Sequence, residues 1–283
     1  MKRGKALRRI LLAAALAAAW AGCLAADTRG SEDAVLKARP GPDMQVDQKC
    51  VYQVRWKGIP AGRASLAISR IEDWRGHKVY YARAEARSNS ILDAFYKVRD
   101  KATSHIDCEG GFSHRYYKRL REGRYDKREV VEYHYDDVEA RYSRMRLGDG
   151  EEAEENVECS APLAGYAQDP LSWLFAIRKE NLEVGRRLVK AIHDGHREWD
   201  LDLVVLAREK VRVGGLGTFW AFKVEPRAGF ESVFVRKGPV YLWLEEGSKI
   251  PLRMEGELPI GRVVVELVDA VNCRIGPFGE GEP

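Results

Sequence analysis

The sequence predicts a mainly β protein, built as a curved antiparallel sheet or a partly open barrel of about a dozen strands with two short helices. Short segments of alternating apolar and polar residues recur from Cys50 to Val271, which is typical of half-buried strands. Glycine, proline, asparagine and aspartate separate these segments, as turns require. Strands do not alternate with helices, which argues against a Rossmann fold or a TIM barrel. An apolar content of 45% excludes a disordered chain.

The first strands form a β-meander. Alternate apolar residues from Cys50 to Trp56 predict one half-buried strand, followed by a turn at 58–62. A second strand follows from Ala64, and a turn at 75–77 leads into a third strand over 79–87. The same pattern predicts further strands at 97–107, 113–121, 124–135 and 138–146.

Two short helices interrupt the strands. Residues 89–96 break the alternation, and Ser88 or Asn89 is a suitable N-cap for a first helix. Asp169 and Pro170 predict the start of a second helix, because proline fits the first helical position after an aspartate cap.

The second half of the chain returns to the β pattern. Residues 149–158 hold six acids and no base, which predicts a solvated loop or hairpin tip. Asp194 and Gly195 predict a tight hairpin between strands at 186–193 and 197–207. Further strands are expected at 209–213, 218–226, 232–236, 239–245, 250–257 and 261–271.

The N-terminus has the features of a signal peptide. Residues 1–26 carry five basic and no acidic residues, and the apolar run at 10–21 is too short to span a bilayer. Small residues allow cleavage after Ala21 or Ala25, whereas residues 20–23 resemble a lipobox that would place a lipid on Cys23. We expect a periplasmic protein, either soluble or lipid-anchored to the outer membrane.

The expected organisation follows from these boundaries. A polar tether covers 27–46, a single β-rich domain covers 47–273 and a flexible tail covers 274–283. The formal net charge of +4 belongs to the signal peptide, because its removal leaves 42 basic against 43 acidic residues. The mature chain is near neutral, so its composition gives no reason to expect a nucleic-acid partner.

With Cys23 either lipidated or removed near the cleavage site, four further cysteines remain in the mature chain. An even number in an exported protein predicts two disulfides, and three connectivities are open. The sequence has no Cys-x-x-Cys spacing, which makes a zinc site the weaker alternative. The candidate residues are Cys50, Cys108, Cys159 and Cys273.

Several motifs in a fixed order resemble one known family. They include Tyr52-Gln-Val-Arg-Trp56, Arg121-Glu-Gly-Arg-Tyr125 and Asp169-Pro-Leu-Ser172. The chain is similar over 46–271 to the bacterial exported family known as domain of unknown function 3108. The resemblance implies an envelope protein and supplies no catalytic residues. By looser analogy, curved antiparallel half-barrels resemble periplasmic carriers of lipid-modified proteins.

A basic stripe at 114–128 is the first candidate for ligand binding. It holds seven Arg or Lys residues against two acids and is interleaved with tyrosines. An anionic glycan or a lipid head group is the ligand that an exported chain would meet. The candidate residues are Arg115, Arg119, Arg121, Glu122 and Tyr125. Ion pairs across a solvated sheet face are the alternative interpretation.

Aromatic residues in the strands give a second clue. Most must be core, but Trp56 and Trp243 could line an apolar concavity that takes a lipid or an acyl chain. We therefore expect a non-enzymatic binding protein for a lipid, lipoprotein or polysaccharide. An envelope glycan hydrolase that uses Glu122 with Asp126 or Glu132 is the alternative.

Other chemistry finds less support in the sequence. His193 and His196 face each other across the predicted hairpin, but two imidazoles are too few for a closed zinc site. Asp169 and Ser172 lack a Gly-x-Ser-x-Gly elbow and are better explained as a helix cap. We expect no catalytic residue, no metal and no cofactor.

Overall fold

The structure, a computed structural model, describes residues 44–147, 156–194, 197–228, 239–258 and 261–276. It confirms a mainly β protein with two short α-helices, α2 (Ser90–Asp93) and α3 (Pro170–Ala176), and a 3-10 turn, η2 (Ile177–Lys179). The strands are β1 (Gln48–Trp56), β2 (Ile59–Trp74), β3 (His77–Ser88), β4 (Arg99–Asp107), β5 (Ser113–Glu122), β6 (Tyr125–His134), β7 (Glu139–Leu147), β8 (Asn156–Pro162), β9 (Arg187–Asp194), β10 (Arg197–Val213), β11 (Gly217–Ala228), β12 (Val240–Glu245), β13 (Pro251–Leu258) and β14 (Gly261–Val271).

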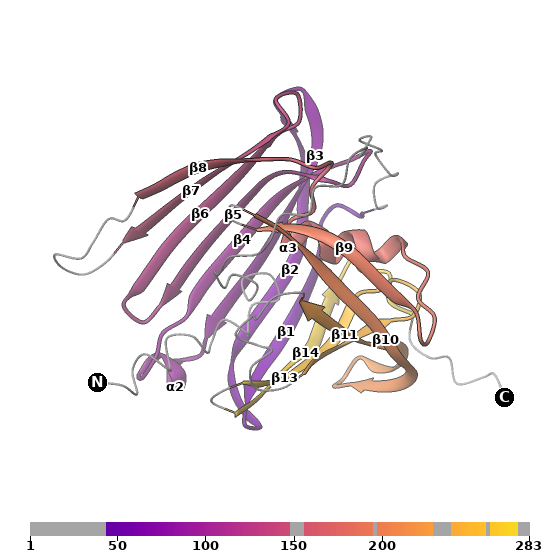
Figure 1. Ribbon diagram of the computed structural model, residues 1–283. Coiled ribbons are helices and arrows are strands. Elements are labelled where there is room, and N and C mark those ends of the chain that lie inside the picture. The colour runs from indigo at the N-terminus through magenta and orange to yellow at the C-terminus, as the bar shows by residue number, and fades with distance from the viewer. Residues whose placement is uncertain (1–43, 148–155, 195–196, 229–238, 259–260, 277–283) are drawn as a thin grey trace.

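All fourteen strands belong to one antiparallel sheet whose order places the first strand in the middle. The chain runs outward from β1 to the edge strand β8, crosses through α3 to the other edge at β9, and returns to pair β14 with β1. The two edge strands do not pair with each other, so the barrel is open (Figure 1). Most connections are tight hairpins, which suits a right-handed twisted meander.

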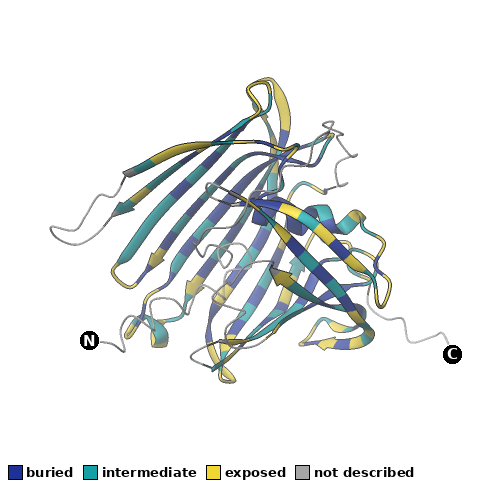
Figure 2. Ribbon diagram, in the orientation of Figure 1, coloured by how far each residue is buried: buried dark blue, intermediate teal, exposed yellow. Residues whose placement is uncertain are grey.

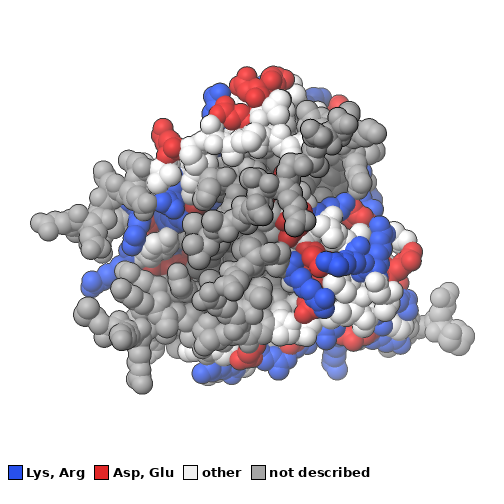
Figure 3. Space-filling model, in the orientation of Figure 1, with Lys and Arg blue, Asp and Glu red and all other residues white. Residues whose placement is uncertain are grey.

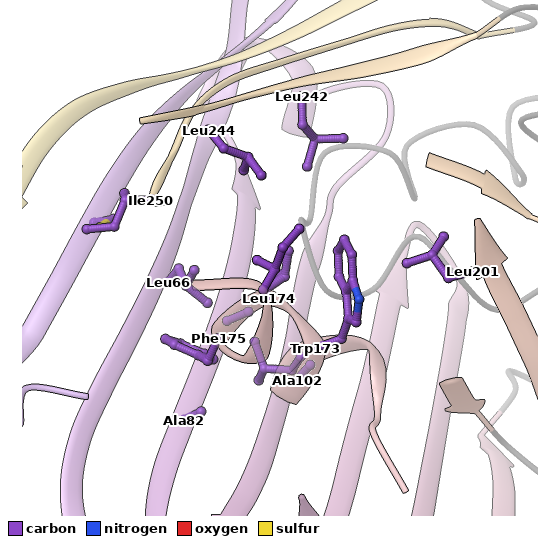
Figure 4. Close-up of a cluster of buried hydrophobic side chains, with 14 of the residues drawn as sticks. Leu66, Ala82, Ala102, Trp173, Leu174, Phe175, Leu201, Leu242, Leu244 and Ile250 are labelled. Atoms are coloured by element: carbon purple, nitrogen blue, oxygen red, sulfur yellow. The ribbon is translucent and has the colours of Figure 1, made fainter. Parts of the chain in front are cut away.

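Burial alternates along the strands, so the sheet has a buried inner face and a more exposed outer face (Figure 2). We call the face against which α3 packs the inner face. Apart from Ser172 the helix is apolar, and its residues from Pro170 to Phe175 are buried. Trp173, Leu174 and Phe175 lie between side chains of both halves of the sheet (Figure 4). These side chains are Leu66, Ala82, Ala102, Leu201, Leu242, Leu244 and Ile250.

Asp169 caps α3 as the sequence predicts. Its Oδ1 accepts hydrogen bonds from the backbone amides of Leu171 (2.7 Å) and Ser172 (2.8 Å), and the Ser172 hydroxyl accepts one from the Asp169 amide. Its Oδ2 accepts a 2.6 Å hydrogen bond from the Ser104 hydroxyl on β4. Burial raises the pKa of Asp169 to about 6, although these hydrogen bonds act in the opposite direction and lower it. The cap therefore also ties the helix to the sheet.

A side-chain contact joins the two halves of the sheet across the interior. The Tyr133 hydroxyl on β6 donates a hydrogen bond to the backbone carbonyl of His193 on β9 (3.2 Å), and the two rings meet edge to face. His193 is itself buried. The edge strand β9 thus folds back over the inner face without backbone pairing to β8.

Several strand boundaries differ from the prediction. The acidic segment expected as a loop at 149–158 contributes its last three residues to β8, which the sequence pattern missed. The second strand begins at Ile59 instead of Ala64, because the turn is confined to residues 57–58. The strands expected at 197–207 and 209–213 form a single β10 with a register shift after Val205. The strand expected at 232–236 lies outside the described residues.

The remaining predictions about the chain ends are mostly untested. The predicted signal peptide and Cys23 lie outside the described residues, as do most of the predicted tether and tail. Met44, assigned to the tether, is buried in the core. Within the described parts of the chain, no helix has the length and apolar character needed to cross a lipid bilayer.

The cap of α3 predicts a specific stability effect. Asp169→Ala leaves two helix amides and the Ser104 hydroxyl without their acceptor in a dry interior. We expect the free energy of unfolding to fall by about 2–4 kcal/mol, measured by urea denaturation. Asp137→Ala, which removes an exposed ion pair to Arg141, is the control and should change it by less than about 0.5 kcal/mol. Equal losses in both variants would contradict this role.

Candidate functional site

The sheet separates the residues that the sequence grouped as one basic site. Arg115, Arg119 and Arg121 alternate with buried residues of β5 and point to the outer face. Glu122 is buried on the inner face, and Tyr125 is its direct cross-strand partner. The prediction of a single site built from all five residues is therefore wrong, because odd and even positions of a strand face opposite sides.

The outer stripe is occupied by ion pairs. Arg119 makes a bidentate contact with Asp126 (3.0 and 2.7 Å), and Arg121 approaches the same carboxylate at 3.5 Å. Arg115 contacts Glu132 at 3.3 Å. Figure 3 shows the opposite side of the molecule, seen from α3, where basic and acidic side chains of other elements also lie next to each other. The cross-strand ion pairs that the sequence left as the alternative are what this face contains.

The two predicted tryptophans also lie on different sides. Trp56 is partly buried and packs against the core, with the Lys57 ammonium 5.4 Å from its ring. Trp243 is on the outer face, because it pairs with Lys223 while the neighbouring Leu242 and Leu244 point inward. Its indole N–H donates to the Glu209 carboxylate at 2.5 Å. Trp243 is therefore not part of an inner apolar concavity.

A different basic group lies on the inner face of β5, β6 and β7. Lys118 is fully buried, and Lys127, Arg144 and Arg146 are at least partly buried on the same face. The register places Lys127 opposite Arg146 and Glu129 opposite Arg144. We call these four residues the inner basic cluster. The sequence stripe contained Lys118 and Lys127, but nothing in it distinguished them from the outer arginines.

Glu129 is the acid at the centre of this cluster. The Lys118 and Lys127 ammonium groups contact its two carboxylate oxygens at 3.0 and 2.6 Å, and the Tyr142 hydroxyl donates to it at 2.7 Å. Burial alone would raise the pKa of Glu129, but the two lysines outweigh it and lower the pKa to about 2. Glu129 is therefore ionised at every physiological pH.

Glu122 belongs to a buried pair of carboxyl groups. Asp100 on β4 is its neighbour, and burial raises the pKa of Asp100 to about 7 and, together with the Asp100 charge, that of Glu122 to about 8. The Tyr96 hydroxyl donates to Glu122 at 3.3 Å. Asp100 Oδ2 and Glu122 Oε1 are buried without another hydrogen-bond partner. A proton shared between the two carboxyl groups would satisfy both oxygens.

This environment argues against the glycosidase alternative. Glu122 is 0% exposed, so its carboxyl group cannot touch a glycan in this conformation. The partners expected for it, Asp126 and Glu132, lie on the outer face in ion pairs with arginine. The pair of carboxylates that the sequence suggested is not assembled.

Two of the four cysteines meet in the structure. The Sγ atoms of Cys50 on β1 and Cys273 after β14 are 3.2 Å apart, close to the buried Arg178. Cys108 follows β4 and Cys159 lies on β8, four strand positions away, or roughly 19 Å across the sheet. All four thiols are free here, so the two predicted disulfides are not present.

The histidines are arranged differently from the expected hairpin pair. His193 is buried beside Tyr133, and His196 lies outside the described residues. At the far end of the sheet, His77, Asp107 and His114 bring three possible ligand atoms within 4.8 Å of one another. Burial lowers the pKa of His114. Burial opposes ionisation of Asp107, but hydrogen bonds from Gly110, His114 and Glu109 lower its pKa. The sequence analysis missed this cluster.

The fold and the inner face define an open, β-barrel-like protein whose helix-filled interior has a basic wall. The chain belongs to the family described as protein of unknown function (DUF3108), whose model matches residues 51–268. This match confirms the resemblance inferred from the motifs. A search of curated proteins found no match.

Two solved structures are similar to the chain at low identity. A β-barrel-like protein of the domain of unknown function DUF1849 from Brucella abortus has a TM-score of 0.47 at 12% identity, covering 80% of this chain and 97% of its own. A protein with a YmcC-like fold from Bacteroides fragilis, itself thought to be exported, has a TM-score of 0.35 at 10% identity, covering 83% and 100%.

The Asp100–Glu122 pair predicts a pH-dependent stability. Because the folded state holds its proton more tightly than the unfolded chain, the pair's contribution is present below about pH 4 and is lost as the pH rises through about 8. The Glu122→Gln variant has only one ionisable carboxyl group in this pair, that of Asp100. We expect the variant to lose less unfolding free energy than wild type between pH 5 and pH 8, by at least about 1 kcal/mol. Chemical denaturation at both pH values measures the difference.

The control for this prediction is Glu158→Gln on the exposed part of β8. Its pH dependence should follow wild type. Parallel stability curves for wild type and Glu122→Gln would show that the buried pair does not share a proton.

Proposed function

We propose that this protein is an exported, non-enzymatic binding protein that holds an acidic lipid against the inner face of β5, β6 and β7. The observation that carries the proposal is the inner basic cluster, a group of cations on a concave, partly buried wall. The signal-peptide features of residues 1–26 support export to the periplasm. A lipid on Cys23 would anchor the protein to the outer membrane, and cleavage beyond Cys23 would leave it soluble.

The charge balance of this wall favours an anion. Among the described residues, the inner faces of these three strands carry the four cations of the cluster against Glu122 and Glu129. Glu122 is largely protonated near neutral pH because its pKa is about 8. A wall with more cations than ionised acids, away from bulk water, strengthens any charge-assisted hydrogen bond to a phosphate or carboxylate.

Access to the cluster supports the same ligand class. Lys127 keeps 15% of its side chain exposed, and the Arg146 guanidinium lies 5.5 Å from the Tyr125 ring. Val157 on β8, opposite Arg144, is a partly buried apolar side chain at the border of the cluster. Cations beside aromatic and aliphatic side chains suit a lipid, with a charged head and an apolar tail, better than a polysaccharide.

Exposed apolar side chains at one end of the sheet support a membrane lipid as the ligand. Ile91 in α2 and Phe95 just after it are 67% and 82% exposed, and Ile59 at the start of β2, next to the 57–58 turn, is 63% exposed. Asn89, the N-cap of α2, donates to the Pro60 carbonyl at 2.7 Å, which holds the helix beside that turn. The β5–β6 turn reaches the same end through the Gly123 amide and the Lys97 carbonyl. Such an apolar rim is suited to contact a membrane or an acyl chain.

The proposal predicts charge-dependent lipid binding. Lys127→Gln/Arg146→Gln should weaken binding to phosphatidylglycerol vesicles at least about tenfold, because two head-group contacts are lost. Co-sedimentation and native mass spectrometry of the mature protein measure this. Phosphatidylcholine vesicles should bind weakly to both proteins.

A matched variant controls for net charge. Arg121→Gln/Arg141→Gln removes two arginines from the outer faces of β5 and β7, where both are exposed. This double variant should bind phosphatidylglycerol like wild type. Equal losses in both double variants, or binding to an acidic oligosaccharide but not to lipid, would overturn the proposal.

We also propose that Cys50 and Cys273 form a disulfide after export. Their sulfur atoms lie 3.2 Å apart, and the bond would close a loop over nearly the whole domain. Reduction, or Cys50→Ser, should lower the unfolding free energy by roughly 2–5 kcal/mol and the melting temperature by about 5–15 °C. Thermal unfolding with and without a reductant measures this.

Thiol counting provides the control. Protein recovered from the periplasm should show two reactive thiols before reduction and four afterwards, and Cys108→Ser/Cys159→Ser should leave the melting temperature unchanged. Four thiols in the unreduced mature protein, or a peptide linking Cys108 to Cys159, would contradict the pairing.

A further inference from the structure

A second polar site lies at the end of the sheet opposite α2, the upper end in Figure 1. His77 begins β3, Asp107 ends β4 and His114 is the second residue of β5. Antiparallel pairing of these three neighbouring strands brings the three positions to the same end. A bulge between His105 and Ile106 leaves His114 without a direct partner in the ladder. Bulges of this kind redirect a side chain at a sheet end.

The donor atoms of these residues are already close. His114 Nε2 lies 2.9 Å from Asp107 Oδ2, and the His77 and His114 ring centroids are 4.7 Å apart. All three ligand atoms lie within 4.8 Å of one another. In tetrahedral zinc sites with bonds of about 2.0–2.1 Å, ligand atoms are about 3.3 Å apart. His77 therefore has to move by at most about 1.5 Å, which an exposed side chain directly after the Gly76 turn can do.

The surroundings fix the two buried ligands. Asp107 Oδ1 accepts hydrogen bonds from the backbone amides of Gly110 (2.7 Å) and Glu109 (2.9 Å), which leaves Oδ2 directed at His114. The Phe112 and Tyr135 rings pack against the His114 ring, with distances of 5.0 and 5.8 Å between ring centroids. Outer contacts of this kind orient ligands in metal sites and limit the cost of assembling them.

We propose that His77, Asp107 and His114 bind a late first-row divalent metal ion, with Zn²⁺ as the best-fitting probe. Two imidazoles and one carboxylate are the donor set that zinc, nickel and copper prefer, whereas magnesium and calcium require oxygen ligands. Asp107 and His114 are buried and His77 is exposed, so the ion is held from one side and a fourth position is open to water. The site does not depend on the lipid proposal, because it lies at the other end of the sheet.

Isothermal titration of the tag-free mature protein with ZnCl₂ tests the proposal. We expect about one Zn²⁺ per chain, and at least about tenfold weaker binding in His77→Ala and in Asp107→Asn. Asp107→Asn keeps an acceptor for the Gly110 and Glu109 amides, so it preserves the turn while it removes the charged ligand. Circular dichroism and melting temperature without metal verify that both variants fold.

Controls separate this site from other ligands on the chain. His134→Ala removes a histidine near Glu132, and Cys108→Ser removes the thiol next to Asp107. Both should bind Zn²⁺ like wild type, and bound Co²⁺ should show d–d absorption without a thiolate charge-transfer band. The proposal is overturned if wild type binds no Zn²⁺, if His77→Ala and Asp107→Asn bind as tightly as wild type, or if Cys108→Ser abolishes binding.

Discussion

The buried start of α3 is the constraint on which the rest of this structure depends. An open sheet of this width would leave its inner face wet unless one chain segment filled it, and α3 does so with side chains that are apolar apart from Ser172. A helix end in a dry interior needs partners for its free amides. Asp169 supplies them and, through Ser104, attaches the helix to β4. The edge strand β9 follows α3, so the path of the chain across the interior also depends on this attachment.

The curved sheet gives the two faces different electrostatics although both are rich in charge. On the outer face, arginines find carboxylates across the strands and remain partly hydrated. On the inner face, Lys118 and Lys127 share the carboxylate of Glu129, and burial raises the pKa of Asp100 and Glu122, which disfavours their ionisation. The same types of charged residue pair and ionise differently on the two faces. The reason is that an unpaired charge costs far more free energy in the buried interior than at the surface. This difference between the two faces is the reason the lipid-binding proposal is placed on the inner face.

Local signals in the sequence predicted local structure well. The Asp169 cap, the hairpin between β9 and β10 and most strands of the meander follow from turn residues and period-two alternation. The pattern failed at β8, where acidic residues hid an edge strand with few neighbours to bury. The alternation could also have shown that Arg121 and Glu122 face opposite sides. It could not show which side α3 would cover.

The sequence by itself determined the fold class, the family and the caps, since these rest on local alternation, turn residues and short motifs that can be read along the chain. Only the tertiary structure decided which charges are buried and which distant residues meet. Cys50 lies beside Cys273 because the first and last strands pair in the middle of the sheet. His77, Asp107 and His114 meet because the ends of three neighbouring strands, β3, β4 and β5, lie at the same end of the sheet. Such contacts depend on sheet order and curvature, which follow from burying α3 and not from any local motif.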